Sequence, residues 1–275
     1  MWERRYGYPK PARDVNGARI YSSEQLNKLV IIRQLMGQGK RPGKLMMLDL
    51  PDLQSLAQEE PKVELNIDQL FDLLKARDAE ALREWFQNQV QAHGLRSFIH
   101  KVMAPATRAV GEAWSRGDLA IHEEHLYTEL MKNLVRQSLT EHYREGGDAP
   151  RIMLTTVPGE RHSLGLLMVE TLLRLGGAEV IAFGAEMPFR DIKDAAVSHK
   201  VDVIGLSFSG SFKSDDAIVM LTGLRQMIDA GIRIWVGGAA FDGGAVMPEG
   251  VELLDGLYGV EQVLVKCKRA ASGNS

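Results

Sequence analysis

From residue 149 to residue 275 the sequence alternates regularly between short apolar runs and amphipathic runs, and this alternation restricts the fold more than any other feature. The apolar runs have strand length, and the runs between them have helical spacing. Such β–α alternation favours a doubly wound parallel sheet, in which ligands bind beyond the carboxyl ends of the strands. We therefore expect a Rossmann-like domain over 149–275, with functional loops directly after Val157, Leu206 and Val236.

Residues 63–148 show no strand-like alternation and are expected to form a four-helix bundle. Gly94 separates the second helix from the third, and Gly117-Asp118 ends the third helix and caps the fourth. Antiparallel packing of the last two helices would bring Trp114, at the end of one, to the same surface as Glu124-His125, near the start of the other.

Residues 1–62 combine turn-forming and basic residues with one amphipathic helix. Asn16-Gly17 predicts a two-residue hairpin turn, because both central positions of such a turn need positive φ. Ser22 is expected to cap the helix that follows. Residues 49–61 are expected to be a polar connector bounded by prolines. The predicted apolar face of the helix contains Leu26, Leu29, Val30 and Leu35.

The net charge of -3 conceals a basic N-terminal end. Residues 1–50 hold ten basic and four acidic side chains, a net charge of +6, which leaves -9 for the remainder. This distribution favours a polyanionic partner at one end, although a solvated basic face without any partner explains the charges equally well.

Other compositional features exclude several classes of protein. The single cysteine, Cys267, excludes an internal disulfide framework and any multi-cysteine metal site. The apolar runs are too short for a membrane span, and the N-terminus has no signal-peptide pattern. We therefore expect a cytoplasmic protein with no membrane partner.

The three loops that follow the predicted strands carry the residues with the most specific chemistry. The first loop reads Gly159-Glu160-Arg161-His162-Ser163-Leu164-Gly165, the second begins Ser207-Phe208-Ser209, and the third begins Gly237-Gly238. No Gly-rich loop followed by Lys and Ser or Thr is present, and no G-x-G-x-x-G run follows the first strand. Phosphate-binding loops of the common nucleotide-binding types are therefore excluded.

Together the three loops resemble the signature of cobalamin-binding domains of the methionine-synthase and methylmalonyl-mutase type. The signature reads Glu160-x-His162-x-x-Gly165, then Ser207-x-Ser209 after 41 residues, then Gly237-Gly238 after a further 27. The resemblance implies that His162 ligates cobalt in place of the dimethylbenzimidazole tail, while Glu160 orients the imidazole. It also implies that the tail lies beside Ser207 and Gly237-Gly238, and that Gly165 lets the next helix approach closely. Ser209 stands where the family usually has Leu, at one contact of the tail pocket.

The N-terminal residues resemble the wing of MerR-type transcription regulators. The resemblance rests on Trp2-Glu3-Arg4-Arg5-Tyr6-Gly7, Pro9, Pro11, Arg13, Gly17, Arg19, Tyr21-Ser22 and Glu24. It implies that this segment binds double-stranded DNA if the full domain is present. Family members have a first helix and most of the recognition helix before this point, so either the true start lies upstream or the base-reading part has been lost. Salt-dependent phosphate contacts are expected from Arg4, Arg5, Arg13 and Arg19.

Trp114, followed after nine residues by Glu124-His125, resembles the cap of light-responsive, cobalamin-dependent repressors of the MerR type. All three segments match that family in order. The resemblance implies that Trp114 packs over the upper axial group of adenosylcobalamin, that Glu124 and His125 meet its adenosyl moiety, and that light releases a homo-oligomer from DNA. Ser115 stands where light-responsive members carry a second cobalt-ligating His.

The sequence therefore predicts a multidomain α and α/β protein that regulates transcription as a cobalamin-dependent repressor. An enzyme is not expected, because a mutase would need a substrate barrel that this length does not hold. Two other classes stay open. A corrinoid carrier of a methyltransferase system shares the bundle and the sheet but lacks a basic wing, and a cobalamin-responsive modulator of another protein would need no reading helix.

Overall fold

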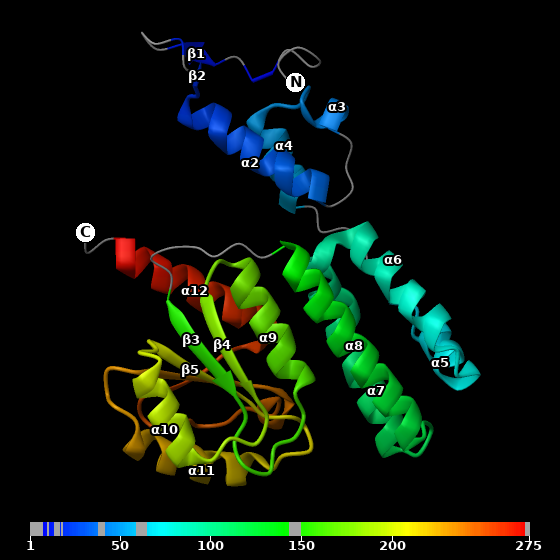
Figure 1. The fold of residues 1–275 in the computed structure, drawn as a ribbon, viewed down its shortest axis with the longest axis vertical. Helices are drawn as coiled ribbons and strands as arrows, with labels where there is room; N and C mark the ends of the chain where they lie inside the picture. The colour runs from blue at the N-terminus through cyan, green and yellow to red at the C-terminus, as the bar shows by residue number, and fades with distance from the viewer. Residues whose placement is uncertain are drawn as a thin grey trace.

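The computed structural model describes residues 8–9, 11–13, 17, 19–37, 42–58, 65–142 and 150–272. Figure 1 shows a small N-terminal group of helices, a bundle of long helices, and an α/β unit beside the bundle. The predicted fold class is confirmed, since a helical bundle precedes a parallel sheet. Within the described ranges, no helix is long and apolar enough to cross a membrane.

The N-terminal group contains β1 (Ala12–Arg13), β2 (Arg19–Ile20), α2 (Ser23–Gly37), α3 (Pro42–Leu45) and α4 (Leu50–Gln58). β1 and β2 form an antiparallel hairpin in which Arg13 pairs with Arg19. Of the predicted turn residues, Asn16 lies outside the described residues. Gly17 has a positive φ of 81°.

The apolar face of α2 also differs from the prediction. Ser22 caps the helix as predicted, because its Oγ accepts a hydrogen bond from a backbone N–H in the first turn at 3.2 Å. Leu26 and Val30 are exposed, however, and Ile32 and Leu35 are the fully buried side chains. The reason is that α3 and α4 contact α2 and form a common small core around Ile32 and Leu35.

The predicted connector at 49–61 is wrong, because residues 50–58 form α4. Asp49 caps this helix by accepting a hydrogen bond from the backbone N–H of Asp52 at 2.9 Å. Pro51 stands in the first turn, where a missing N–H costs no helical hydrogen bond. Leu53 is fully buried in the N-terminal core. The proline therefore marks the start of a helix and not a break in the chain.

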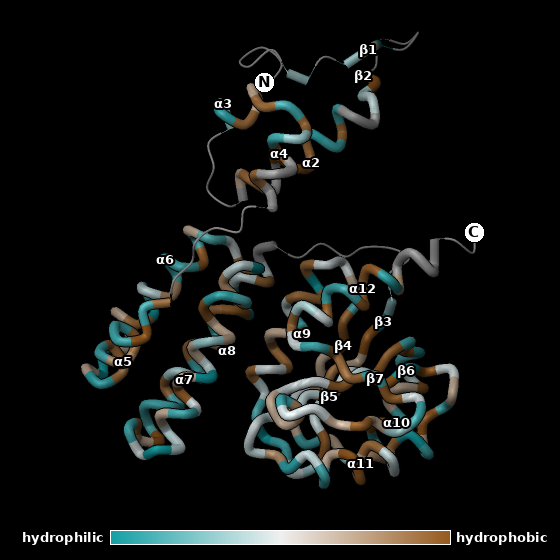
Figure 2. The backbone as a smooth tube through the Cα atoms, turned by 180° about the vertical axis from the view of Figure 1, so that it is seen from behind, coloured by the Kyte–Doolittle hydropathy of each residue, from teal (hydrophilic) through white to brown (hydrophobic). Residues whose placement is uncertain are grey.

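The bundle contains α5 (Ile67–Ala76), α6 (Ala79–Phe98), the π-helical turn η1 (Ile99–Met103), α7 (Ala104–Ser115) and α8 (Ile121–His142). Asn66 and Asp78 cap α5 and α6, each accepting a backbone hydrogen bond at 3.0 Å. Gly94 has φ 76° and ψ 156°, which breaks the helical geometry inside α6 at the predicted boundary. In Figure 2 the hydropathy colours alternate along these helices, as expected when each helix buries one face.

The turn between α7 and α8 is built mainly by backbone hydrogen bonds. The N–H groups of Gly117 and Asp118 donate to carbonyls in the last turn of α7, at 2.9 and 2.8 Å, in a Schellman motif that ends the helix as predicted. The prediction that Asp118 caps α8 is wrong, because its carboxylate accepts a hydrogen bond from Arg116 instead. Glu123 caps α8 by accepting from the backbone N–H of Ala120 at 2.8 Å.

The sheet has five parallel strands in the order β4 (Glu179–Gly184), β3 (Arg151–Thr155), β5 (Val203–Ser207), β6 (Arg233–Gly237) and β7 (Val251–Leu253). Helices α9 (Leu164–Leu175) and α12 (Gly256–Ser272) cover one face, and α10 (Phe189–Ser198) and α11 (Ser214–Met227) cover the other. This is the predicted doubly wound arrangement. The strand order reverses at β3, and ligands bind at such a switch point in sheets of this kind.

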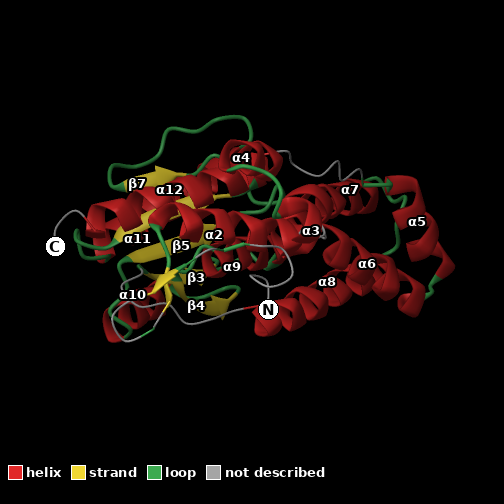
Figure 3. Ribbon diagram, turned by 90° about the horizontal axis from the view of Figure 1, so that it is seen from above, coloured by secondary structure: helices red, strands yellow, loops and turns green. Residues whose placement is uncertain are grey.

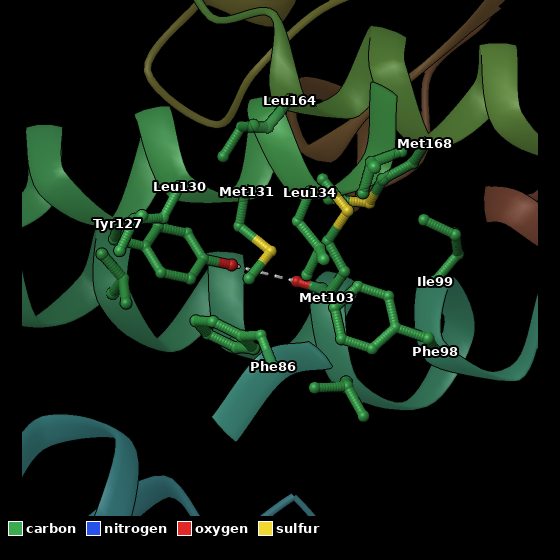
Figure 4. Packing of buried hydrophobic residues seen from close by; sticks show 14 of the residues in the cluster. Phe86, Phe98, Ile99, Met103, Tyr127, Leu130, Met131, Leu134, Leu164 and Met168 are labelled. Carbon is green, nitrogen blue, oxygen red and sulfur yellow. Dashed lines mark hydrogen bonds between the residues drawn. The ribbon is translucent and has the colours of Figure 1, made fainter. Parts of the chain in front are cut away.

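Helix α9 belongs to two hydrophobic cores at once. Leu164 and Met168 lie beside Met103 and Leu134 in the core of the bundle (Figure 4). Leu166, on another side of the helix, packs on the sheet. Figure 3 shows the strands on one side of α9 and the bundle on the other. The first functional loop runs directly into α9, so both units are fixed relative to that loop.

A polar cluster joins the bundle to α12. The ring of His100, on η1, stacks on Tyr258 with centroids 4.2 Å apart. Its Nε2 lies 3.0 Å from Oε2 of Glu261, and Arg96 donates a hydrogen bond to the other carboxylate oxygen. The His100 side chain is only 7% exposed. This cluster therefore supplements the apolar contacts of α9 between the two units.

Truncating a side chain on the face of α9 that packs into the bundle should lower the stability of the whole protein. Leu172 is fully buried in the bundle core, so we expect Leu172→Ala to lower the free energy of unfolding by about 2 to 5 kcal/mol, the cost of a buried cavity. Urea denaturation measures this loss. Val219→Ala on α11, where the side chain is 72% exposed, is the control and should change stability by less than about 0.5 kcal/mol. Equal losses in the two variants would contradict a shared role for α9.

Candidate functional site

The loops after β3, β5 and β6 meet at the carboxyl edge of the sheet, at the same end of the molecule as the α7–α8 turn (Figure 1). An ion pair joins the two units here, because Nη2 of Arg108 on α7 lies 3.3 Å from Oδ2 of Asp242, beyond β6. The charge of Glu124 on α8 also acts on His162 in the first loop. The candidate site is therefore bordered by both the bundle and the sheet.

Glu160 lies at the centre of this edge with its carboxylate fully hydrogen-bonded. The residue is 1% exposed. Oε1 accepts from the backbone N–H of His162 at 2.9 Å, and Oε2 accepts from the N–H and hydroxyl of Ser209 at 2.7 and 2.8 Å. Burial alone would raise the pKa of Glu160, but the hydrogen bonds from His162 and Ser209 outweigh it and lower the pKa to about 2. A negative charge is therefore fixed beneath the loop at neutral pH.

His162 uses one ring nitrogen to contact this carboxylate and leaves the other open. Nδ1 lies 2.7 Å from Oε1 of Glu160 and 3.0 Å from Oγ of Ser209. The side chain is 58% exposed, and no described residue hydrogen-bonds Nε2. The hydrogen bond to Glu160 raises the pKa of His162, despite the opposing effect of burial. In the neutral ring with Nδ1 protonated, Nε2 carries the free lone pair that ligates a metal.

Two threonines that the sequence analysis did not single out shape the first loop. The hydroxyl of Thr156 donates to the carbonyl of Glu160 at 2.5 Å and accepts from the N–H of Glu186 at 2.8 Å. The hydroxyl of Thr155 donates to the carbonyl of Gly184 at 2.9 Å. Both side chains are fully buried and tie the loop to the end of β4. The available signal was a pair of hydroxyl residues at the end of an otherwise apolar run.

Glycines bring the three loops close together. A Cβ on Gly165 would lie 2.9 Å from Oγ of Ser207, so glycine lets the first turn of α9 approach the end of β5. A Cβ on Gly238 would lie 2.0 Å from the carbonyl oxygen of Phe208, and its φ of 114° is unfavourable for other residues. Gly237 pairs with Ser207 in the sheet register.

Ser209 makes a contact that the sequence did not suggest. The sequence placed it at a contact of the tail pocket, where related domains have Leu. The structure places its hydroxyl on the carboxylate of Glu160 and beside the ring of His162. Ser209 therefore belongs to the network that orients the imidazole. A single sequence gives no signal for this contact, because it joins residues 49 positions apart.

The predicted cap residues all lie on the α7–α8 hairpin. Trp114 is in the last turn of α7 and is 45% exposed. The carboxylate of Glu124 accepts a hydrogen bond from the hydroxyl of Thr128 at 2.7 Å and lies 2.6 Å from Nδ1 of His125. The hairpin thus offers an exposed aromatic ring together with a positioned carboxylate and imidazole, a combination suited to a mixed apolar and polar ligand.

The predicted DNA-contacting arginines are described only in part. Arg13 and Arg19 are paired residues of the β1–β2 hairpin, and both are exposed. Nη1 of Arg13 donates to the carbonyl of Gly17 at 2.9 Å. Arg4 and Arg5 lie outside the described residues. Adjacent guanidinium groups on an exposed hairpin are well suited to phosphate groups.

The possible metal ligands among the described side chains fit a metal ion that a macrocycle already holds. Within the described part of the chain, no group of three or more His, Cys, Asp or Glu side chains is arranged to hold a metal ion. His162 instead offers one open nitrogen, and Glu160 supplies the carboxylate that commonly orients a ligating imidazole. With this arrangement His162 would suit the role of one protein ligand to a corrinoid cobalt.

Both units are similar to known domains. Models of the B12 binding domain match residues 66–137, in the bundle, and residues 150–256, in the α/β unit. The HTH-type transcriptional repressor CarH of Myxococcus xanthus is 28% identical over 87% of this chain and 83% of its own length. The repressor CarA of the same organism is 24% identical over 75% of this chain and 69% of its own.

A solved structure shares the fold. The monomethylamine corrinoid protein of Methanosarcina barkeri matches with a TM-score of 0.51 and 17% identity, over 72% of this chain and 96% of that one. At this identity the likeness concerns the arrangement of bundle and sheet alone.

Removing the charge of Glu160 should lower the pKa of His162. Glu160→Gln keeps the shape of the side chain but removes the anion that favours the imidazolium, so we expect the pKa to fall toward its ordinary value of 6.5. NMR titration of the ligand-free protein measures the change. Glu129→Gln, an exposed change on α8, is the control and should leave the His162 titration as it is.

Because the pKa of His162 is raised in the folded protein, the free energy of unfolding depends on pH with a known sign. Protonated His162 stabilises the folded, ligand-free protein below pH 6.5, and this stability is lost as the pH rises through the folded pKa. Glu160→Gln should reduce that dependence of stability on pH. A His162 titration that is the same with and without the Glu160 charge would contradict the coupling.

Proposed function

We propose that this chain binds double-stranded DNA under the control of adenosylcobalamin. Its two matches to B12 binding domain models and its similarity to two repressors support a cobalamin-binding regulator. The observation that carries the proposal is the His162 imidazole, whose Nδ1 is held by buried Glu160 and whose Nε2 is open. We also propose that light controls DNA binding by acting on the bound adenosylcobalamin. The chain would act as a repressor in the cytoplasm.

His162 would hold the cobalt through Nε2, and Glu160 would keep Nδ1 protonated and the ring in place. Trp114, Glu124 and His125, on the hairpin of the bundle, would cover the opposite face of the corrin ring. Bound there, adenosylcobalamin supplies a cobalt–carbon bond that green light breaks. A large aromatic cap opposes a methyl-transfer role, because the acceptor of a methyl group needs access to that face.

A ligand between the two units can act as a switch. It would contact the hairpin of the bundle and the loops of the sheet, and so favour the arrangement in which both contacts are made. Such an arrangement would support a homo-oligomer. Several basic hairpins would then meet DNA together, which raises affinity through multivalency without any new contact.

A corrinoid carrier of a methyltransferase system is the second candidate. The fold likeness to the monomethylamine corrinoid protein favours it, since the bundle and the sheet are common to both. The exposed hairpin with Arg13 and Arg19 favours the regulator, because a carrier has no use for a phosphate-binding wing. DNA binding therefore separates the two candidates.

Cobalamin binding should depend on His162. We expect the wild-type protein, reconstituted with adenosylcobalamin in the dark, to give an absorption spectrum with the tail base off and a histidine on the cobalt. His162→Ala should lose that spectrum, and His93→Ala, on α6, should keep it. Green illumination of the wild type should produce a lasting spectral change despite Ser115. A wild type that binds no cobalamin would contradict the proposal, and binding without a lasting photoproduct would remove light from it.

Phosphate contacts from the β1–β2 hairpin should be visible in the salt dependence of DNA binding. The double variant Arg13→Ala, Arg19→Ala should lower the slope of log affinity against log salt by about 2, at roughly 0.9 for each lost phosphate contact. Fluorescence anisotropy with a mixed-sequence duplex, in the presence of adenosylcobalamin in the dark, measures the slope. Lys193→Ala, an exposed change on α10, is the matched control. Equal slopes for all three proteins would contradict a role for this hairpin.

A further inference from the structure

Trp235, on β6, buries an indole N–H that has no hydrogen-bond acceptor among the described residues. The residue is 2% exposed and lies between the sheet and helices α9 and α12, in one cluster with Leu154, Val203 and Leu264. Most buried donors in folded proteins have an acceptor, so an unpaired one requires an explanation. A ligand that brings an acceptor into this layer would provide it.

Between Trp235 and the carboxyl edge of the sheet, the neighbouring strand positions on this face carry small residues. The sheet register places Gly205 opposite Trp235 and Ser207 opposite Gly237. Because side chains alternate between the two faces of a strand, all four positions belong to the face that α9 and α12 cover. Gly165, in the first turn of α9, lies over Ser207. These small residues form a strip that runs from the carboxyl edge of the sheet, next to the His162 loop, to Trp235.

One flexible side chain fills the inner part of this strip. Cδ2 of Leu154 lies 2.6 Å from the place where a Cβ on Gly205 would stand. A leucine side chain can move to another rotamer, whereas a Cβ at position 205 would be fixed. The strip can therefore admit a flat apolar group, with the Ser207 hydroxyl at its outer end and the indole N–H of Trp235 at its inner end.

Cobalamin carries such a group. If His162 occupies the lower position on the cobalt, the base of the nucleotide tail is released as a flat aromatic ring whose nitrogen has lost its partner. An unpaired nitrogen in an apolar layer is costly, and an indole N–H is a donor that can never act as an acceptor. The released base thus offers an acceptor nitrogen without a donor, and Trp235 offers a donor N–H without an acceptor.

We propose that the indole N–H of Trp235 donates a hydrogen bond to the released tail base of bound cobalamin, and that Trp235 thereby selects corrinoids that carry such a base. This assignment rests on the proposed function, because it requires His162 on the cobalt. Trp235 is a specificity residue in this account and takes no part in ligating the metal.

Trp235→Phe tests the assignment, because it removes the N–H and keeps an aromatic ring. The probes are cobalamin and cobinamide, which has the corrin ring but no nucleotide tail. We expect the variant to bind cobalamin about tenfold more weakly than the wild type, the effect of one buried hydrogen bond, and to bind cobinamide equally well. Its ligand-free melting temperature should fall only by the cost of the smaller ring, since the N–H has no acceptor to lose. Trp85→Phe, in the bundle, is the matched control and should leave both affinities unchanged.

Equal losses for the two corrinoids would overturn the assignment, because they would indicate a packing role, and so would an unchanged affinity for cobalamin. If the variant does not fold, the indole N–H resonance of Trp235 in the wild type provides a second test. It should move downfield when cobalamin binds and stay in place with cobinamide, and the same shift with both would overturn the assignment. A wild type that binds neither corrinoid would instead overturn the proposed function, and this inference with it.

Discussion

The structure depends on one helix that is buried on two sides. α9 supplies Leu164, Met168 and Leu172 to the bundle core and Leu166 to the layer over the sheet, so neither core is complete without it. The helix also begins where the His162 loop ends. A change at that loop, such as binding a ligand, is therefore made at the point where the two units meet. A ligand bound there would contact both units, which is the physical basis of the proposed control.

The second constraint is the buried charge of Glu160. Its two oxygens accept hydrogen bonds from the first loop, through His162, and from the second, through Ser209. One carboxylate therefore fixes the spacing of two loops, sets the tautomer of the imidazole and supplies a negative charge behind it. The glycines at 165 and 238 let the surrounding backbone close around this network. The imidazole of His162 is therefore held in place by contacts from both loops.

Much of this architecture could be predicted from the sequence, because hydrophobic periodicity reports directly on which face of an element is buried. The doubly wound sheet, the break at Gly94 and the stop at Gly117 follow from such local signals. The helix α4 was missed because a proline at the start of a helix has the same sequence pattern as a chain break. The buried face of α2 was misplaced because it is determined by contacts with other helices, which the sequence of α2 alone does not show. The contact between Ser209 and Glu160 is long-range and leaves no local pattern.

The central claim is that Nε2 of His162 ligates the cobalt of bound cobalamin. The most direct measurement is the electron paramagnetic resonance spectrum of the cobalt(II) form bound to protein labelled with nitrogen-15 in histidine only. We expect one nitrogen-15 nucleus to split each cobalt line into a doublet, and His162→Ala to abolish the doublet. A triplet from the nitrogen-14 of the tail base, or no nitrogen splitting at all, would contradict it.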